Sequence, residues 1–334
     1  MEMILIRKSA ILESRHGCKD LKHNSSHPGS VGPRRHELKS SIDRHLQLLS
    51  LYFHKTTADD FARILNVVQN NLDSLDAQDG ANIFPTSKQD VTTNPAWLNG
   101  VTPDSTGSTG DTIASTIIVV DKGSGVVDAF YMYFYANNWG GTILNFNVGN
   151  HVGDWEHNVV RFNNGQPQQV WYSQHSNGEA FRYSAVSKDG IRPITFSSNA
   201  SHANYATTGT QDRVLPDLDL PGLILNDYAD EGPRWDPVLN SYFFKYDIAS
   251  GSFSSHDGTT PTAWLIFVGK WGDQQYPDSD PKQKNLLGLA RKFTGGPTGP
   301  KDKGLNRKNI CPDSDDFCFV RSRLDTRDVG EELW

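Results

Sequence analysis

The chain has 334 residues, of which 36% are hydrophobic, 10% aromatic and 21% charged, and its formal net charge is −7. No run approaches the about 18 apolar residues that a membrane-spanning helix needs, and the chain is too rich in aromatic residues to be wholly disordered. The 29 Gly and 17 Pro, against three Met, favour many turns and short elements over a helical bundle.

The first 50 residues differ from the rest of the chain. Residues 1–48 hold nine Lys/Arg and five Asp/Glu, so this segment is basic while the remainder is acidic. It shows no hydrophobic periodicity, and we predict a mostly disordered basic tail over 1–50. The apolar start breaks too soon for a secretory signal. Because nucleic acid is held by clustered Lys/Arg, the acidic body predicts no nucleic-acid partner, and we also expect no transmembrane segment.

Residues 51–325 are predicted to form one mainly β domain, followed by a short polar tail at 326–334. Apolar residues at helical spacing predict a helix over 59–75. From residue 112 on, short β-branched and aromatic runs alternate with Gly, Asn, Pro and Asp, as in a β-sandwich. We therefore expect a β-sandwich-like domain with peripheral helices and long loops. The predicted strands are 116–120, 126–135, 155–162, 169–173, 181–186, 191–196 and 263–268, with hairpin turns at 121–125 and 163–167.

The densest cluster of ionisable residues is the segment 151–157, HVGDWEH. Side chains alternate along a strand, so Asp154, Glu156 and Asn158 are expected on one face and His157 on the other. Two carboxylates on one face repel each other unless something cationic lies between them. His157 and Asn158 are expected to support such a site from beside the ligands rather than to be ligands.

The two carboxylates predict a divalent-cation site, with His151 brought back over them by a bend at Gly153. His175 and His202, which follow other predicted strands, could supply further nitrogen ligands. Oxygen ligands with one or two imidazoles favour Mg²⁺, Ca²⁺ or Mn²⁺, and zinc is also compatible. The alternative is that the carboxylates form ordinary hydrogen bonds or salt bridges and the histidines are satisfied separately.

Two cysteines, Cys311 and Cys318, bracket an acidic loop of six residues. This gap suits a small disulfide in an oxidising compartment and lacks the paired C-x-x-C spacing of a zinc site. The residues alone leave open whether the disulfide forms.

Several long motifs point to a known family. They are 150–157 (NHVGDWEH), 171–179 (WYSQHSNGE) and 201–205 (SHANY), flanked by 128–135 (DAFYMYFY), 271–278 (WGDQQYPD) and 295–300 (GGPTGP). With them the chain resembles the vacuolar protein sorting-associated protein 62 family over roughly residues 55–320. The resemblance implies a role in delivering proteins to the vacuole and a vacuole-associated or cytoplasmic location. Secretion is the expectation if the true start of the chain lies elsewhere and carries a signal.

A second resemblance is local. The order His, two residues, Asp-Trp-Glu and a later Ser-x-His is similar to the central region of necrosis- and ethylene-inducing peptide-like proteins. Those are secreted β-sandwich cytolysins that coordinate a divalent cation and recognise sphingolipid head groups. The resemblance implies His151, Asp154 and Glu156 as cation ligands, with His175 nearby. The sequence departs from that family at Val152 and Gly153, where the family has a basic residue and a histidine.

Three functions are compatible with these observations. The first is a non-enzymatic binding module in which a cation organises a surface for a glycan, a lipid head group or a protein. The second is a metal-dependent hydrolase that uses His151, Asp154, Glu156 and His175, with His175 or His202 as general base. The third is a secreted membrane-active protein. We favour the first, because the family resemblance supports it.

Overall fold

The computed structural model describes residues 5–8, 49–53, 81–87, 89–143, 145–213, 225–286, 288, 290–315 and 317–324. The helix predicted over 59–75 and the tail at 326–334 lie outside the described residues. The prediction of a mainly β, sandwich-like fold is confirmed. The helices in the described ranges are short 3₁₀ segments, and none is long and apolar enough to cross a membrane. They are η2 (Val91–Thr93), η3 (Ala96–Asn99), η4 (Pro237–Asn240), η5 (Ala263–Leu265) and η6 (Pro300–Lys303).

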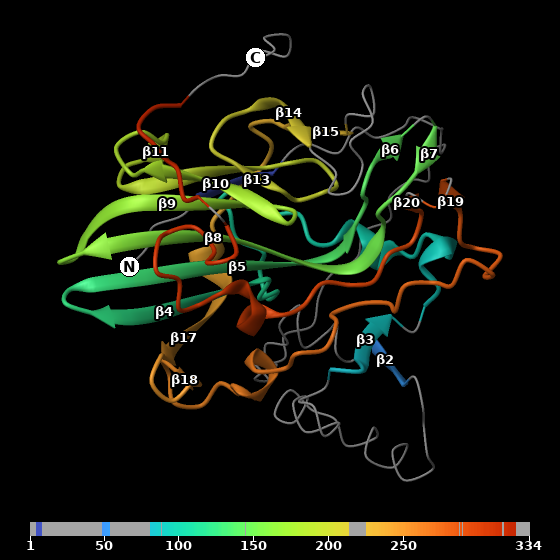
Figure 1. Ribbon diagram of the computed structural model, residues 1–334, viewed down its shortest axis with the longest axis horizontal. Coiled ribbons are helices and arrows are strands. Elements are labelled where there is room, and N and C mark those ends of the chain that lie inside the picture. Colours follow the sequence, from blue (N-terminus) through green and yellow to red (C-terminus); the bar gives the residue numbers. More distant parts are fainter. Residues whose placement is uncertain are drawn as a thin grey trace, which may run out of the picture.

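An eight-stranded sheet is the central layer (Figure 1). Its middle strands form an antiparallel meander, and parallel pairs, β17 with β4 and β10 with β21, extend it on either side. In spatial order the strands are β18 (Ser252–Ser255), β17 (Ser241–Asp247), β4 (Ser115–Gly123), β5 (Val126–Asn138), β8 (His151–Asn163), β9 (Gln166–Gln174), β10 (Asn177–Arg182) and β21 (Val320–Arg321).

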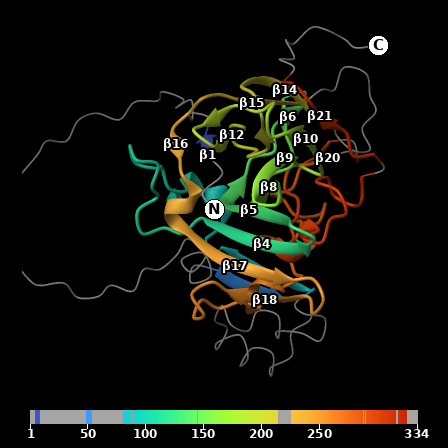
Figure 2. The same cartoon turned by 90° about the vertical axis from the view of Figure 1, so that its left-hand side faces the viewer.

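A smaller sheet faces the central one (Figure 2). Its strands are β11 (Lys188–Asp189), β12 (Arg192–Ser197), β1 (Leu5–Lys8) and β16 (Arg234–Trp235), with β13 (Asn204–Tyr205) also paired to β12. Four separate two-stranded pairs complete the described strands: β2 (Leu49–Phe53) with β3 (Ile83–Ser87), β6 (Thr142–Ile143) with β7 (Phe146–Asn147), β14 (Gly209–Arg213) with β15 (Leu225–Ala229), and β19 (Asn285–Leu286) with β20 (Ala290–Arg291).

Most predicted strands match described ones, and two do not match well. The runs at 116–120, 126–135, 155–162, 169–173 and 191–196 are β4, β5, β8, β9 and β12, and both predicted turns join the expected strands. The run at 181–186 overlaps β10 only at Phe181 and Arg182. The run at 263–268 contains η5 instead of a strand. Its apolar residues Trp264, Leu265 and Phe267 cover the face of the central sheet and are not part of it.

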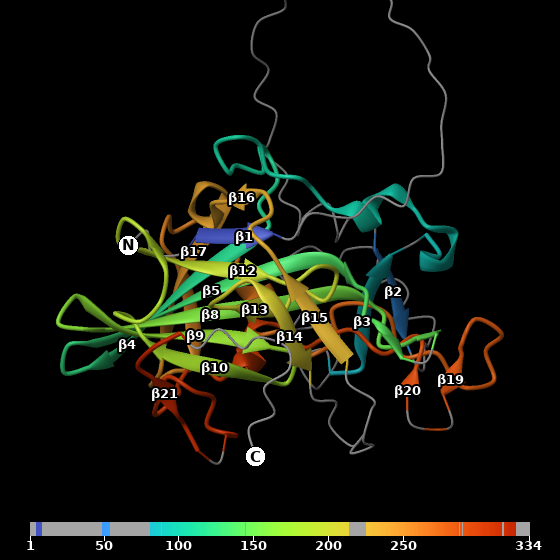
Figure 3. The same ribbon diagram turned by 90° about the horizontal axis from the view of Figure 1, so that it is seen from above.

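The N-terminal segment predicted to be disordered contributes a strand. β1 pairs in parallel with β12, at Leu5 with Ile194, and antiparallel with β16, at Ile6 with Trp235. Seen from above, β1 lies between these two strands and joins them into one sheet (Figure 3). Leu5–Lys8 therefore lie within the fold, because their backbone groups pair with two strands that are distant in the sequence. Strand β2 also begins before residue 51, at Leu49.

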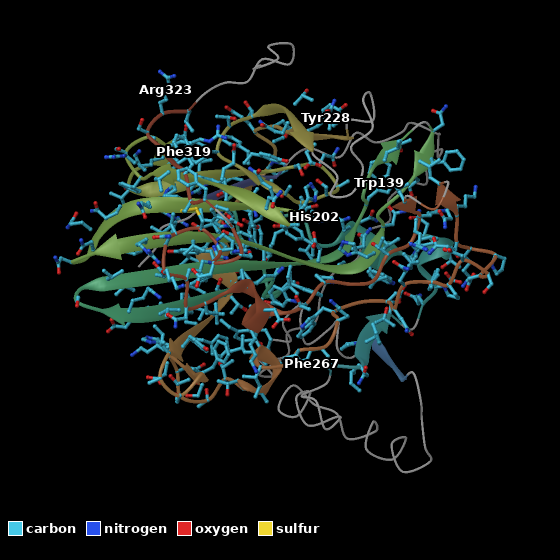
Figure 4. The ribbon with its side chains drawn as sticks, viewed as in Figure 1. Trp139, His202, Tyr228, Phe267, Phe319 and Arg323 are labelled. Atoms are coloured by element: carbon cyan, nitrogen blue, oxygen red, sulfur yellow. A yellow bond between two sulfur atoms is a disulfide. The ribbon has the colours of Figure 1, made fainter. Side chains whose placement is uncertain are left out.

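Both faces of the central sheet are buried. On one face Tyr131, Tyr133 and Tyr135 of β5 pack with Trp235 of the smaller sheet. On the other face Trp155 of β8 belongs to a hydrophobic cluster that also includes Trp264, Trp271 and Phe267, the last labelled in Figure 4. The middle of β8 is thus enclosed on both sides, and polar side chains on it need partners within the fold.

An ion pair fastens the C-terminal segment to the sheet. Arg161 of β8 gives two hydrogen bonds of 2.7 Å to Asp128 of β5, whose side chain is fully buried. The same guanidinium donates to the backbone carbonyls of residues 307, 308 and 309. Just beyond, a disulfide joins Cys311 to Cys318.

Candidate functional site

The candidate site begins where β8 starts, and Gly153 shapes it. Its φ is +69°, and a Cβ at this position would lie 2.1 Å from the carbonyl oxygen of Trp271. Only glycine adopts this conformation readily and allows the segment at 271 to approach so closely. The bend also lets His151 Nδ1 reach the Gly153 carbonyl at 2.6 Å. A carbonyl oxygen can only accept, so Nδ1 carries the proton and Nε2 of a neutral His151 keeps its lone pair.

Asp154 and Glu156 lie on the face of β8 that meets the smaller sheet, and both are buried. Asp154 accepts a hydrogen bond of 3.1 Å from His202 Nδ1, and Glu156 accepts one from the hydroxyl of Ser173. Burial raises the pKa of Glu156 well above its usual range, and the charge of Asp154 raises it further. Burial also raises the pKa of Asp154, but the hydrogen bond from His202 and the charge of His151 outweigh burial and leave that pKa lowered.

His202 is held beside Asp154 by a hydrogen bond and by stacking of its ring on a tyrosine. It follows β12 at a φ of +60°, and its ring stacks on Tyr135 with centroids 3.9 Å apart and planes 5° from parallel. Figure 4 labels His202 near the middle of the view. The structure therefore brings His202 directly onto Asp154.

His175 pairs with a residue that the sequence did not reveal. Its Nε2 lies 2.6 Å from Oδ2 of Asp227 on β15. Asp227 also accepts hydrogen bonds from Ser201 and Tyr205, at 2.6 and 2.7 Å. Burial raises the pKa of Asp227, but the hydrogen bonds and the charge of His175 prevail and lower it to about 2. No spacing motif precedes Asp227 in the chain, so only the folded structure shows this pairing.

His157 and Asn158 are packing residues. His157 faces the aromatic side of the sheet, where its Nε2 accepts a hydrogen bond of 2.6 Å from Arg307. Burial lowers the pKa of His157 well below its usual range, and the charge of Arg307 lowers it further. Asn158, on the opposite face, accepts hydrogen bonds from Tyr133 and Thr195. Both side chains have their partners within the fold, and these contacts do not indicate that either residue is a metal ligand.

A large cleft opens beside His151 and His202. Its volume is about 1400 Å³, and its lining includes seven asparagines and several Ser and Thr residues. Two indoles, Trp97 and Trp139, also line it; Trp139 is 46% exposed and is labelled towards the β6–β7 side in Figure 4. Few charged groups line the cleft and most of its exposed lining is apolar, so its chemistry suits a neutral ligand that has both apolar and hydrogen-bonding groups.

The donor set has the chemistry of a divalent-cation site. Two buried carboxylates and nearby imidazoles are the ligands that Mn²⁺, Ca²⁺, Mg²⁺ or zinc take in proteins. In the described parts of the chain, however, no three His, Cys, Asp or Glu side chains are gathered closely enough to hold an ion as they stand. A cation would have to displace existing contacts, including the bonds from Ser173 to Glu156 and from His202 to Asp154.

Residues 140–294 match the family model described as vacuolar protein sorting-associated protein 62. The resemblance to this family is confirmed. A putative vacuolar protein sorting-associated protein, TDA6, of Saccharomyces cerevisiae (strain ATCC 204508 / S288c) is 41% identical over 249 residues, which cover 69% of this chain and 52% of the relative. Vacuolar protein sorting-associated protein 62 of the same yeast is 38% identical over 247 residues, with 68% and 52% covered. The chain thus spans about half the length of these relatives.

Solved structures show only a distant likeness. A non-toxic HaNLP3 protein is 15% identical with a TM-score of 0.22, over 44% of this chain and 60% of that chain. A protein titled NLPPya in complex with glucosamine is 12% identical with a TM-score of 0.19, over 45% and 66%. Nothing about the fold or ligand of this chain follows from scores this low.

The stretch that matches the vacuolar protein sorting 62 family contains the whole candidate site. His151, Asp154, Glu156, His175, His202 and Asp227 all fall between residues 140 and 294. The site is therefore part of the family region, whereas β1 and the disulfide lie outside the matched stretch.

Proposed function

We propose that this domain is a non-enzymatic binding module with a role in delivering proteins to the vacuole. In this proposal a divalent cation, held by His151, Asp154, Glu156 and His175, organises the mouth of the cleft. The names of the two yeast relatives support the vacuolar role and a vacuole-associated location. The ligand would be a glycan, a lipid head group or a protein segment rich in hydroxyl and amide groups.

One observation carries the proposal: two carboxylates are buried on the same face of one strand. Burial and the charge of Asp154 disfavour ionised Glu156, so both carboxyl groups can be charged together only if a positive charge compensates them. Arg161 compensates Asp128 on the same sheet, whereas no described Lys or Arg makes an ion pair with Asp154 or Glu156. A bound cation would supply the missing positive charge, as it does in many carboxylate sites.

His151 connects the cation to the cleft. It lines the cleft, and its Nδ1 is tied to the Gly153 carbonyl, so Nε2 is the nitrogen available to a metal. The cation would supply fixed positive charge for an electron-rich ligand oxygen. The amides, hydroxyls and indoles of the cleft would supply hydrogen bonds and stacking.

The test combines metal analysis with thermal unfolding. The purified wild type is expected to hold about one equivalent of metal; after chelation, Mn²⁺ or Ca²⁺ at 100 times Kd should stabilise it by about 2.7 kcal/mol. Glu156→Gln should lose most of this gain, because it removes one ligand charge. Its metal-free Tm should not fall, because burial and the charge of Asp154 already disfavour the ionised form of Glu156.

Glu231→Gln is the matched control, because Glu231 is exposed and the chemical change is the same. It should bind metal as the wild type does. A wild type that holds no stoichiometric metal and gains no stability from any of Mg²⁺, Ca²⁺, Mn²⁺ or Zn²⁺ would refute the cation. The vacuolar role is tested in yeast lacking both relatives: expression of this chain should reduce the release of a soluble vacuolar hydrolase into the medium.

A metal-dependent hydrolase is the second candidate, because two histidines are each held by a buried carboxylate. His202 is paired with Asp154 and His175 with Asp227, an arrangement that orients general bases in many enzymes. A panel of esterase, phosphatase and glycosidase substrates, compared between the wild type and His175→Ala, tests it. Turnover that depends on both metal and His175 would favour this reading over the binding module.

A further inference from the structure

We propose that the cleft binds an extended, uncharged peptide segment, which adds to the edge of β5 as a further strand. This inference rests on the proposed binding function and names the ligand of that cleft, but it does not depend on a cation. Its basis is a stretch of β5 that lines the cleft and has no described strand on one side.

Strand β5 is longer than its neighbour on one side. The pairing of β4 with β5 starts at Ser115, whereas β5 continues beside β8 as far as Asn138. One further hydrogen bond on the β4 side joins Phe134 N to the Ala114 carbonyl oxygen at 2.9 Å. Beyond this bond, no described strand lies along that side of residues 135–138, which we term the open edge.

Ala136 directs its backbone groups to the open edge. Successive residues of a strand direct these groups to opposite edges, so the N–H and C=O of Ala136 face the same side as those of Phe134. On that side, none of the described residues makes a hydrogen bond with them. Ala136 is partly exposed, whereas Phe134 and Tyr135 are buried. Such an edge is a template for the main chain of another segment, because each unpaired group gains a partner.

The open edge forms part of the wall of the large cleft. Its residues all line the cleft, together with the segment 97–103 and the turn at 197–200. The cleft volume of about 1400 Å³ exceeds the about 300–1,000 Å³ of small-molecule pockets, which favours an oligomeric ligand. Backbone groups recur on one edge of a strand about every 7 Å. An extended peptide has this repeat and a sugar does not, so the open edge favours a peptide over a glycan.

The side chains of the cleft indicate the chemistry of the peptide. Asp273 and Lys292 are the only Asp, Glu, Lys or Arg residues in the described lining, and their charges are opposite, so a peptide without charge fits best. Val101 and Trp139 also line the cleft and are exposed, so they offer contact to an apolar side chain. Because side chains alternate along a strand, every second residue of the peptide would meet the same wall.

The first experiment tests whether the peptide binds through its main chain. The full chain, after chelation, is screened against acetylated and amidated decapeptides built from uncharged residues, and the tightest binder is then N-methylated at odd or at even positions. One of the two methylated peptides should bind about 10-fold more weakly or worse, and the other should stay within about 3-fold. Equal effects of the two methylation patterns would overturn the proposal. So would binding of a glycan or a lipid head group in the absence of any decapeptide that binds.

The second experiment places the peptide at the open edge. Amide hydrogen exchange of the wild type is measured with and without the selected decapeptide. The amide of Ala136 should exchange about 10-fold more slowly in the complex, because it gains a hydrogen bond. The amide of Phe134 is the internal control, because it is already bonded to Ala114. Equal slowing of both amides, or no slowing of Ala136, would overturn the proposal without any variant having to fold.

A pair of variants at one position completes the test. Ala136→Pro removes the N–H group at the open edge, where a proline is tolerated because no ladder hydrogen bond is lost. It should weaken binding of the decapeptide about 10-fold. Ala136→Gly is the matched control, because it keeps the N–H group, and it should bind within about 3-fold of the wild type. Equal affinities of the two variants would overturn the role of the edge.

The outcomes separate this inference from the cation. If the chelated protein binds the decapeptide and the wild type holds no metal, the cation of the proposed function fails and the peptide site stands. If the wild type holds metal but binds no decapeptide, only the peptide site is overturned.

Discussion

Replacing Asp128 by Asn tests whether the buried ion pair with Arg161 holds the domain together. The substitution keeps the size of the side chain and removes its charge. Arg161, whose side chain is only 13% exposed, would then lack its anionic partner while remaining between the sheet and the 307–309 segment. Breaking a buried pair from one side is costly because a charge is left uncompensated.

The size of the effect follows from the contacts of Arg161. Loss of one partner of a buried pair costs about 3–5 kcal/mol. Arg161 keeps its hydrogen bonds to three backbone carbonyls, which compensate part of its charge, so the lower end of that range is expected. For a domain of this size about 2 °C of Tm corresponds to 1 kcal/mol. Asp128→Asn should therefore lower Tm by about 6 °C on that scale.

Thermal unfolding of Asp128→Asn beside Asp278→Asn gives the matched comparison. Asp278 also accepts two hydrogen bonds from one arginine, Arg291, but these side chains are 49% and 34% exposed. Exposed pairs contribute little because water and salt screen them, so Asp278→Asn should change Tm only slightly. Equal losses of Tm in the two variants would refute the reasoning, because burial would then not decide the strength of the pair.

Three further predictions concern other parts of the fold. Gly153→Ala should lower the free energy of unfolding by about 3 kcal/mol, because the new Cβ overlaps a neighbouring carbonyl oxygen and the φ is unfavourable for alanine. Gly165→Ala has a similar φ but lies in open space, so it should cost only about 1 kcal/mol. Replacing both Cys311 and Cys318 by Ser should lower the free energy of unfolding by about 2–3 kcal/mol, as expected for a loop with a sequence separation of 7. A reductant should lower the Tm of the wild type and leave the Tm of this double variant unchanged. The folded protein keeps His157 neutral, whereas in the unfolded chain this histidine takes up a proton below a pKa of about 6.5. The wild type should therefore lose about 2 kcal/mol of stability on going to pH 5, and His157→Gln should not. Stability profiles against pH that run parallel in the two proteins would contradict this.

The local pattern of the sequence was sufficient to predict the strand that carries the site. Alternation along 154–158 placed Asp154 and Glu156 on one face and His157 on the other, as β8 does. The run at 263–268 was misread because apolar residues that cover a sheet have the same composition as those within it. Periodicity describes which side of a chain is buried, but it does not state what the chain pairs with.

The contacts that complete the site could not be predicted, because they join segments that are distant in the sequence. The pairing of His175 with Asp227 depends on how β14 and β15 fold against the turn after β12. His202 was considered as a possible further ligand and as a candidate general base, and the structure places it on Asp154 through a turn at positive φ. Such long-range contacts are set by the packing of the two sheets, which no local motif encodes.

The position of β1 has a consequence for synthesis of the protein. Leu5–Lys8 leave the ribosome well before their partners, and one neighbouring strand, β16, is complete only at Trp235. At about 5–20 residues per second, the interval is on the order of 10 to 45 seconds. For most of that time, until β12 is complete at Ser197, the nascent chain carries this strand without either of its partners. The smaller sheet is therefore assembled by the late return of the chain to β1.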